Sequence, residues 1–127
     1  MKRIATEKAP QAIGPYSQAI VTGNLVFASG QIAINPETNE VVEGGITEQA
    51  HQVFKNISNL LAAAGTSMQN VVKTTVFMAD MADFATVNGI YAEYFTEPYP
   101  ARSAVAVKSL PKNVLIEVEV IAEVSNS

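Results

Sequence analysis

The segment at residues 114–124, VLIEVEVIAEV, alternates between apolar and mostly polar side chains along its length. In an extended strand, successive side chains point to opposite faces, so this pattern sorts into two sets. A strand with one wholly apolar face must belong to a sheet that other elements cover on that face. The wholly apolar set is Val114, Ile116, Val118, Val120, Ala122 and Val124, and the other set is Leu115, Glu117, Glu119, Ile121 and Glu123.

Other stretches have the composition of strands. Residues 18–43 hold β-rich runs around a Gly23-Asn24 turn and around the turn NPETN, which predicts three or four antiparallel strands. Residues 70–80 and 103–107 are rich in valine and threonine or in small residues, and each predicts one more strand. The strand at 114–124 therefore has several candidate neighbours.

Two stretches change to helical spacing. In residues 46–67, apolar side chains recur three or four positions apart, with Thr47 as the expected N-cap and Gly65 as the expected residue after the helix. Residues 80–97 repeat the pattern, with Asp80 as cap and two prolines following. Two helices are too few to cover both faces of a sheet. The chain therefore predicts an α+β fold, one mixed sheet with both helices on one face, in a single domain over residues 1–127.

Arg102 stands immediately before the predicted strand at 103–107. If this strand and 114–124 form a hairpin, Arg102 shares with Glu117 and Glu119 the face that the helices leave uncovered. That face also carries alanine, leucine and isoleucine, which predicts a partner subunit and hence a homo-oligomer. Two interpretations of the guanidinium stay open: it binds a carboxylate ligand through its planar fork, or it only pairs with the two glutamates.

Composition excludes several classes of function. The chain has no cysteine and one histidine, so no thiol nucleophile and no metal cluster is expected. Its net charge is −4 and its eight basic residues are scattered, which disfavours nucleic-acid binding. No run of about 18 apolar residues is present and the first residues lack the apolar stretch of a signal peptide, so a cytoplasmic protein without a membrane segment is expected.

Several short motifs, taken together over nearly the whole chain, resemble the RidA/YjgF family of reactive intermediate deaminases. Their order and spacing carry the resemblance, since each motif alone would be weak. They are IGPYSQ at 13–18, SGQI at 29–32, VVKTTVFMADMADFATVN at 71–88, PARSAVAV at 100–107 and LPKNVLIEVEVIA at 110–122.

The resemblance implies a chorismate-mutase-like α+β fold and a homotrimer with three sites in the clefts between subunits. It implies hydrolysis of 2-imino acids, or their enamine tautomers, to 2-oxo acids and ammonia. The implied substrates are 2-iminobutanoate and 2-iminopropanoate/2-aminoacrylate, released by pyridoxal-phosphate dehydratases acting on threonine and serine. The implied activity needs no cofactor and no metal.

The motifs also imply roles for particular residues. By resemblance, the arginine of PARS grips the substrate carboxylate, so this role falls on Arg102. The tyrosine of IGPY, Tyr16, would contact substrate or water. The first glutamate of IEVE, Glu117, would position water and exchange a proton with it, while the role of Glu119 stays open.

Four more positions are implied to bind substrate. SGQ places Ser29 and Gly30 along the cleft wall, and FATVN places Asn88 near the site. Ala104, also implied to bind substrate, stands where the family often has cysteine, and activity would survive this change if the position contacts substrate through its backbone. The chain also has Ala33 where the family often has proline.

Two alternatives to the deaminase stay open. One is a non-catalytic trimer that binds small carboxylates as a regulator, which would keep the same arginine. The other is a ribonuclease, a label attached to parts of this family, against which the acidic charge balance argues.

Overall fold

The computed structural model describes residues 1–124, and residues 125–127 of the expected single domain lie outside the described residues. Ten helices and strands and three short 3-10 turns make up the fold. The strands are β1 (Lys2–Ile4), β2 (Ala19–Thr22), β3 (Leu25–Gln31), β4 (Ile34–Asn35), β5 (Glu40–Val41), β6 (Val71–Met78), β7 (Ala101–Ala106) and β8 (Ile116–Glu123). The helices are α1 (Ile46–Ala63) and α2 (Phe84–Tyr94), and the 3-10 turns are Met68–Asn70, Met81–Asp83 and Pro111–Asn113.

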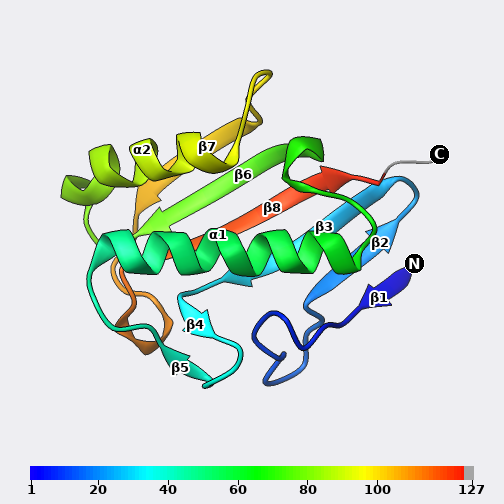
Figure 1. The fold of residues 1–127 in the computed structure, drawn as a ribbon, viewed down its shortest axis with the longest axis horizontal. Coiled ribbons are helices and arrows are strands. Elements are labelled where there is room, and N and C mark those ends of the chain that lie inside the picture. Colours follow the sequence, from blue (N-terminus) through cyan, green and yellow to red (C-terminus); the bar gives the residue numbers. More distant parts are fainter. Residues whose placement is uncertain (125–127) are drawn as a thin grey trace.

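Six strands form one mixed sheet in the order β1-β2-β3-β8-β6-β7, and β4 and β5 form a separate small hairpin. All pairs in the large sheet are antiparallel except β6 and β7, which run parallel. The α2 helix connects these two parallel strands, as a crossover between parallel neighbours requires. Both helices lie across the same face of the sheet (Figure 1). The predicted α+β class is confirmed.

The core lies between this face and the helices. Ile116, Val118, Val120 and Ala122 of β8 are all buried, so the apolar face predicted from the alternation is confirmed. Opposite them, α1 buries its apolar side chains at the predicted helical spacing: Ala50, Val53, Phe54, Ile57, Leu60 and Leu61.

The predicted N-cap of α1 is wrong by two residues. The cap is Gly45, not Thr47, and its N–H donates to Oε1 of Glu48 at 2.8 Å. The glutamate of the first turn thus reaches back to satisfy the end of the helix. At the other end Gly65 has φ +85°, as expected for the residue after a helix. Asp80 caps the 3-10 turn that leads into α2, where its Oδ1 accepts from the N–H of Ala82 at 2.8 Å.

The predicted hairpin of the last two strands is wrong. β8 inserts between β3 and β6, and β7 pairs with the far side of β6. Arg102 lies beside Thr74, which is fully buried on the helix-covered face, whereas Glu117 lies beside Phe77 on the open face. The prediction rested on the short connection between β7 and β8, which is typical of adjacent strands. In the structure α2 connects β6 to β7, and β7 lies at the edge of the sheet, on the side of β6 opposite to β8.

β7 is the edge strand on this side, and most of its residues are exposed. The N–H of Val107, just past its end, donates to the carbonyl of Met78. Because successive N–H groups along a strand point to opposite edges, those of Arg102 and Ala104 point to the outer edge, away from β6. Among the described residues, neither helix has the length and apolarity needed to cross a bilayer.

Candidate active site

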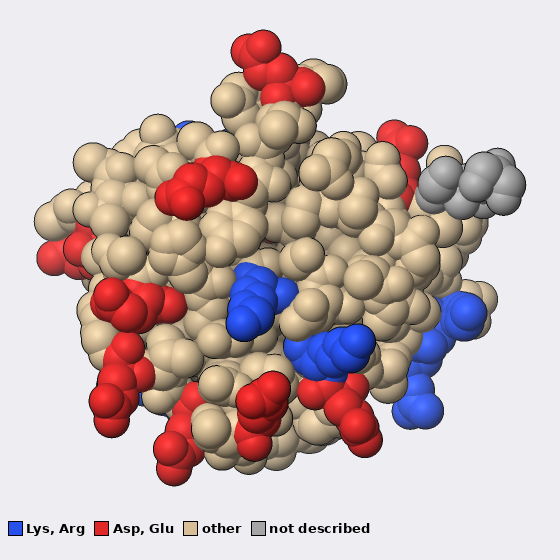
Figure 2. Space-filling model, in the orientation of Figure 1, with Lys and Arg blue, Asp and Glu red and all other residues tan. Residues whose placement is uncertain are grey.

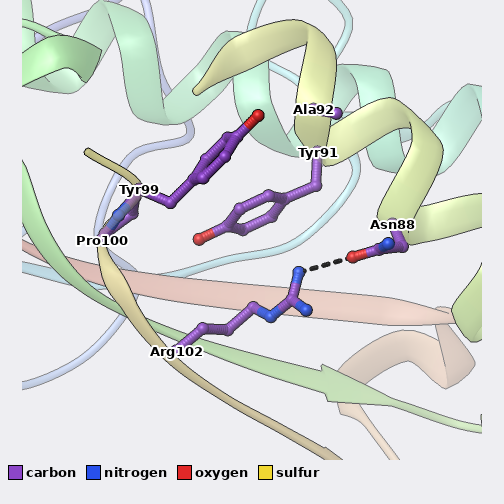
Figure 3. A pocket seen from close by; sticks show the side chains of 6 residues that line it. All are labelled: Asn88, Tyr91, Ala92, Tyr99, Pro100 and Arg102. Atoms are coloured by element: carbon purple, nitrogen blue, oxygen red, sulfur yellow. Dashed lines mark hydrogen bonds between the residues drawn. The ribbon is translucent and has the colours of Figure 1, made fainter. Parts of the chain in front are cut away.

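Arg102 extends from β7 toward α2, where Asn88 and Tyr91 face its guanidinium (Figure 3). Nη1 donates to Oδ1 of Asn88 at 2.8 Å. The central guanidinium carbon lies 4.8 Å from the ring centroid of Tyr91 and 5.3 Å from that of Phe84. Such contacts with aromatic faces favour the cation and restrict its orientation. Within residues 1–124 the guanidinium donates to this amide and to no carboxylate.

Phe84, Asn88 and Tyr91 stand at positions i, i+4 and i+7 of α2, so one face of the helix presents all three. The sequence motifs implied a role near the site for Asn88, but none for Phe84 or Tyr91. The signal that could have found them is this spacing together with an arginine in the strand that follows. The Tyr91 hydroxyl lies 2.9 Å from Oγ1 of the buried Thr74, and burial raises the pKa of Tyr91.

A cavity of about 460 Å³ opens beside this arginine. Its lining residues come from α2, from the segment before β7 and from β7 itself: Asn88, Tyr91, Ala92, Tyr99, Pro100 and Arg102. Ala104 follows two residues along the same face of β7 and is half-buried. Free N–H groups at the strand edge and a guanidinium with unused donors thus lie together, an arrangement that suits a carboxylate. We call this group, Asn88, Arg102 and Ala104, the arginine half-site.

Tyr16, Ser29, Gly30 and Glu117 line a second cavity, of about 560 Å³. We call this group the glutamate half-site. Glu117 is half-buried on the open face of β8, and two effects raise the pKa of its carboxyl. The larger is the loss of solvent around the carboxylate, and the smaller is repulsion by Glu119 two residues along the strand. A raised pKa is typical of carboxyl groups that exchange protons near neutral pH.

The loop that carries Tyr16 is fixed by partly buried hydrogen bonds. The side chain of Gln18 accepts from the N–H of Thr6 and donates to the carbonyls of Thr6 and Pro10. Ser29 Oγ donates to the carbonyl of Ser17 at 2.6 Å. Tyr16 itself is 53% exposed, and its hydroxyl accepts from the N–H of Ile13 at 3.4 Å.

The structure does not bring the two half-sites together within one chain. Arg102 lies on the helix-covered face of the edge strand β7, and Glu117 lies on the open face of β8, with β6 between the two strands. The predicted shared face is therefore wrong, and so is the interpretation that Arg102 only pairs with Glu117 or Glu119 of its own chain. A small ligand cannot contact Arg102 and Glu117 of the same chain.

Among the described residues, no group of three or more His, Asp or Glu side chains lies close enough together to bind a metal ion. Nδ1 of the single histidine, His51, lies 2.8 Å from the hydroxyl of Tyr94. This hydrogen bond connects α1 to α2. This histidine is half-buried rather than fully solvated.

Comparison with known proteins assigns the family. The sequence model of the family described as Endoribonuclease L-PSP matches residues 6–124. The chain belongs to this family. The resemblance to RidA/YjgF proteins is thereby confirmed, since RidA proteins are members of the same family.

Members of the endoribonuclease L-PSP family match this chain over nearly its full length. A human protein named 2-iminobutanoate/2-iminopropanoate deaminase is 50% identical over 119 residues, which cover 94% of this chain and 87% of the human one. The crystal structure of RidA from the Antarctic bacterium Psychrobacter sp. PAMC 21119 has a TM-score of 0.94 at 47% identity and covers 98% of this chain and 100% of that one. The crystal structure of E. coli TdcF with bound serine has a TM-score of 0.92 at 42% identity, with the same coverage.

Proposed function

We propose that this protein hydrolyses 2-iminobutanoate and 2-iminopropanoate, or their enamine tautomers, to 2-oxo acids and ammonia. The observation that carries the proposal is the arginine half-site, where a positioned guanidinium has no carboxylate partner among residues 1–124. The human relative named as a deaminase supports the reaction. The serine bound to TdcF supports a small amino-acid-like ligand with a carboxylate.

The proposed reaction requires only that the protein orient the substrate and transfer protons. A protonated imine is electrophilic, so the enzyme must orient it and move protons rather than supply a strong nucleophile. Arg102 and the N–H of Ala104 bind the carboxylate. The ionised Glu117 takes a proton from a water molecule whose oxygen bonds to C2. The π electrons of the C2–N double bond move to the nitrogen as the oxygen adds, and Glu117 then returns the proton to this nitrogen. The C2–N bond breaks with its electron pair on the departing ammonia, while the C2 hydroxyl forms the C=O bond of the 2-oxo acid and gives its proton to Glu117, which passes it to the ammonia. Tyr16 hydrogen-bonds the substrate or the water, while Ser29, Gly30 and Asn88 shape the cleft.

We place the reaction in clefts between subunits of a homotrimer. A small substrate can reach both half-sites only if they come from different chains. The open face of the sheet carries Phe27 and Val105, which are 42% and 44% exposed, and these side chains suit burial against a second copy. Cyclic symmetry would set the arginine half-site of each subunit against the glutamate half-site of the next.

RNA cleavage is not the proposed activity, despite the description of the family. The chain has net charge −4, and on the helix-covered face the few basic side chains are interspersed among acidic ones (Figure 2). A phosphate backbone requires clustered Lys and Arg. Neither a cofactor nor a metal ion takes part in the proposed steps.

The proposed function is tested with a pyridoxal-phosphate threonine dehydratase that releases 2-iminobutanoate. The formation of 2-oxobutanoate is followed with and without this protein, and we expect the wild type to accelerate it above spontaneous hydrolysis. Binding of a small carboxylate without acceleration would instead indicate the regulator.

Mixed oligomers test where the site lies. If each site takes Arg102 from one subunit and Glu117 from another, two inactive variants complement each other. Co-expression of equal amounts of Arg102→Ala and Glu117→Gln chains should restore about one quarter of the wild-type activity, because a quarter of the sites combine an intact arginine with an intact glutamate. Activity of the purified mixture, compared with each variant alone, is the measurement. No recovery in verified mixed oligomers would place both groups of a working site in one chain.

The pH profile tests the electrostatics of Glu117. Its carboxyl must be ionised to accept a proton, so its raised pKa makes kcat fall on the acid side at a higher pH than for an ordinary glutamate. Glu119→Gln removes the repulsion that contributes to this shift and should move the acid limb of the kcat profile to lower pH. Glu123→Gln, on the same face of β8, is the control and should leave the limb in place. If the acid limb of the kcat profile stays in place in Glu119→Gln, Glu119 does not raise the pKa of Glu117.

A further inference from the structure

Glu117 lies directly over the α-carbon of Gly30. A Cβ placed on Gly30 would overlap Oε2 of this glutamate and lie 2.9 Å from its Cδ and 3.2 Å from its Cγ. Real Cβ atoms essentially never approach another heavy atom below 3.0 Å, so the carboxylate occupies space that any side chain at position 30 would need. Both residues line the same cavity.

The backbone of Gly30 does not by itself require glycine. The glycines with positive φ are Gly14, Gly23, Gly44 and Gly65, and Gly30 is not among them. Its place in the sheet explains the close approach: the register between β3 and β8 shifts between Ala28 and Gln31, so Ser29 and Gly30 leave the regular ladder beside Glu117. Glycine stands here because of the space it leaves free.

We infer that Gly30 is a positioning residue whose missing side chain lets the Glu117 carboxylate lie against β3 in the glutamate half-site. This inference deepens the proposed function and rests on it for its effect on catalysis. With alanine at position 30, the backbone keeps its conformation and the flexible end of Glu117 gives way. The carboxylate then swings out toward solvent, away from the place where it would meet the attacking water.

The test is a double-mutant cycle that combines Gly30→Ala with Glu117→Gln. We expect kcat for imine hydrolysis to fall about 10- to 100-fold in Gly30→Ala, since a displacement of about 1 Å can cost that much. In the Glu117→Gln background, the same substitution should cause no further loss, because it acts only through the carboxylate it displaces. The melting temperature and oligomeric state should stay at the wild-type values.

A second measurement does not depend on activity. Carbon NMR of protein labelled at the glutamate carboxyl carbons, with the Glu117 signal assigned by its loss in Glu117→Gln, follows the ionisation of this group. In Gly30→Ala its pKa should fall toward the ordinary glutamate value, because the carboxylate regains solvent. If wild-type protein hydrolyses no imine, the proposed function fails, yet this titration still decides the positioning role.

Gly89→Ala is the matched control. Gly89 lies in α2, and a Cβ there meets nothing within 4 Å. The Gly89→Ala substitution should leave both the turnover and the titration of Glu117 unchanged. The inference is overturned if Gly30→Ala keeps the wild-type turnover and Glu117 pKa, or if it causes a further loss in the Glu117→Gln background.

Discussion

Replacing Arg102 by alanine is expected to lower kcat/KM for imine hydrolysis by roughly 30- to 1,000-fold, a loss of about 2–4 kcal/mol of transition-state binding. In the proposed reaction the guanidinium is the cation that meets the substrate carboxylate, so its loss would remove two charge-assisted hydrogen bonds at once. The side chain is exposed and contacts only the surface of α2, so the fold should survive. The measurement is steady-state kinetics with enzymatically generated 2-iminobutanoate, beside circular dichroism and sedimentation.

The matched control is Arg3→Ala. Arg3 is the other arginine of the chain and lies in β1, at the opposite edge of the sheet, so its removal should leave kcat/KM unchanged. Arg102→Lys keeps the charge without the planar fork and should recover only part of the activity. An Arg102→Ala protein that unfolds, or that hydrolyses imines at the wild-type rate, would contradict the substrate-binding role.

Glu117→Gln should lower kcat by about 10²- to 10⁴-fold while weakening the binding of a non-reactive small carboxylate far less. Glutamine keeps the size of the side chain but cannot take a proton from water. We propose that the carboxylate of the ligand binds in the other half-site, so we expect its affinity to depend on Arg102 rather than on Glu117. Turnover and the dissociation constant of a 2-oxo acid product are measured on the same preparations.

Glu123→Gln changes the same type of residue on the same face of β8 and serves as the control, since Glu123 is exposed and distant from the cavity. Equal losses of turnover and of carboxylate affinity in Glu117→Gln would count against a proton-transfer role. They would indicate instead that this glutamate shapes the binding cleft.

Local patterns predicted the layers of this fold well. The alternation at 114–124 and the helical spacing of α1 are set by burial on one side. That burial is confirmed for both elements, except that Val124 at the end of the alternating stretch is half-buried. β1 was missed because a strand of three residues is too short to show any period. The order of the strands failed for another reason: it depends on contacts between distant segments. The α2 helix between β6 and β7 was nevertheless a usable signal for a parallel crossover.

For the candidate site, too, the sequence predicted some features and not others. Motifs identified Arg102, Asn88, Tyr16 and Glu117, and the structure gives each a cavity. The face of the sheet on which each residue lies follows from strand order, so the error in strand order put Arg102 on the wrong face. The Gly30 contact could not be predicted either, because it depends on a local shift in register.

The outer edge of β7 has a consequence for the protein outside catalysis. This strand is made of small residues and one arginine, and half of its backbone donors and acceptors face away from β6. An uncovered edge of this kind is a template on which strands of other chains add, the first step of aggregation. If a neighbouring subunit of the proposed trimer covers this edge, separation of the subunits would threaten solubility as well as turnover. Selection for a soluble chain and selection for an active one would then act on the same strand.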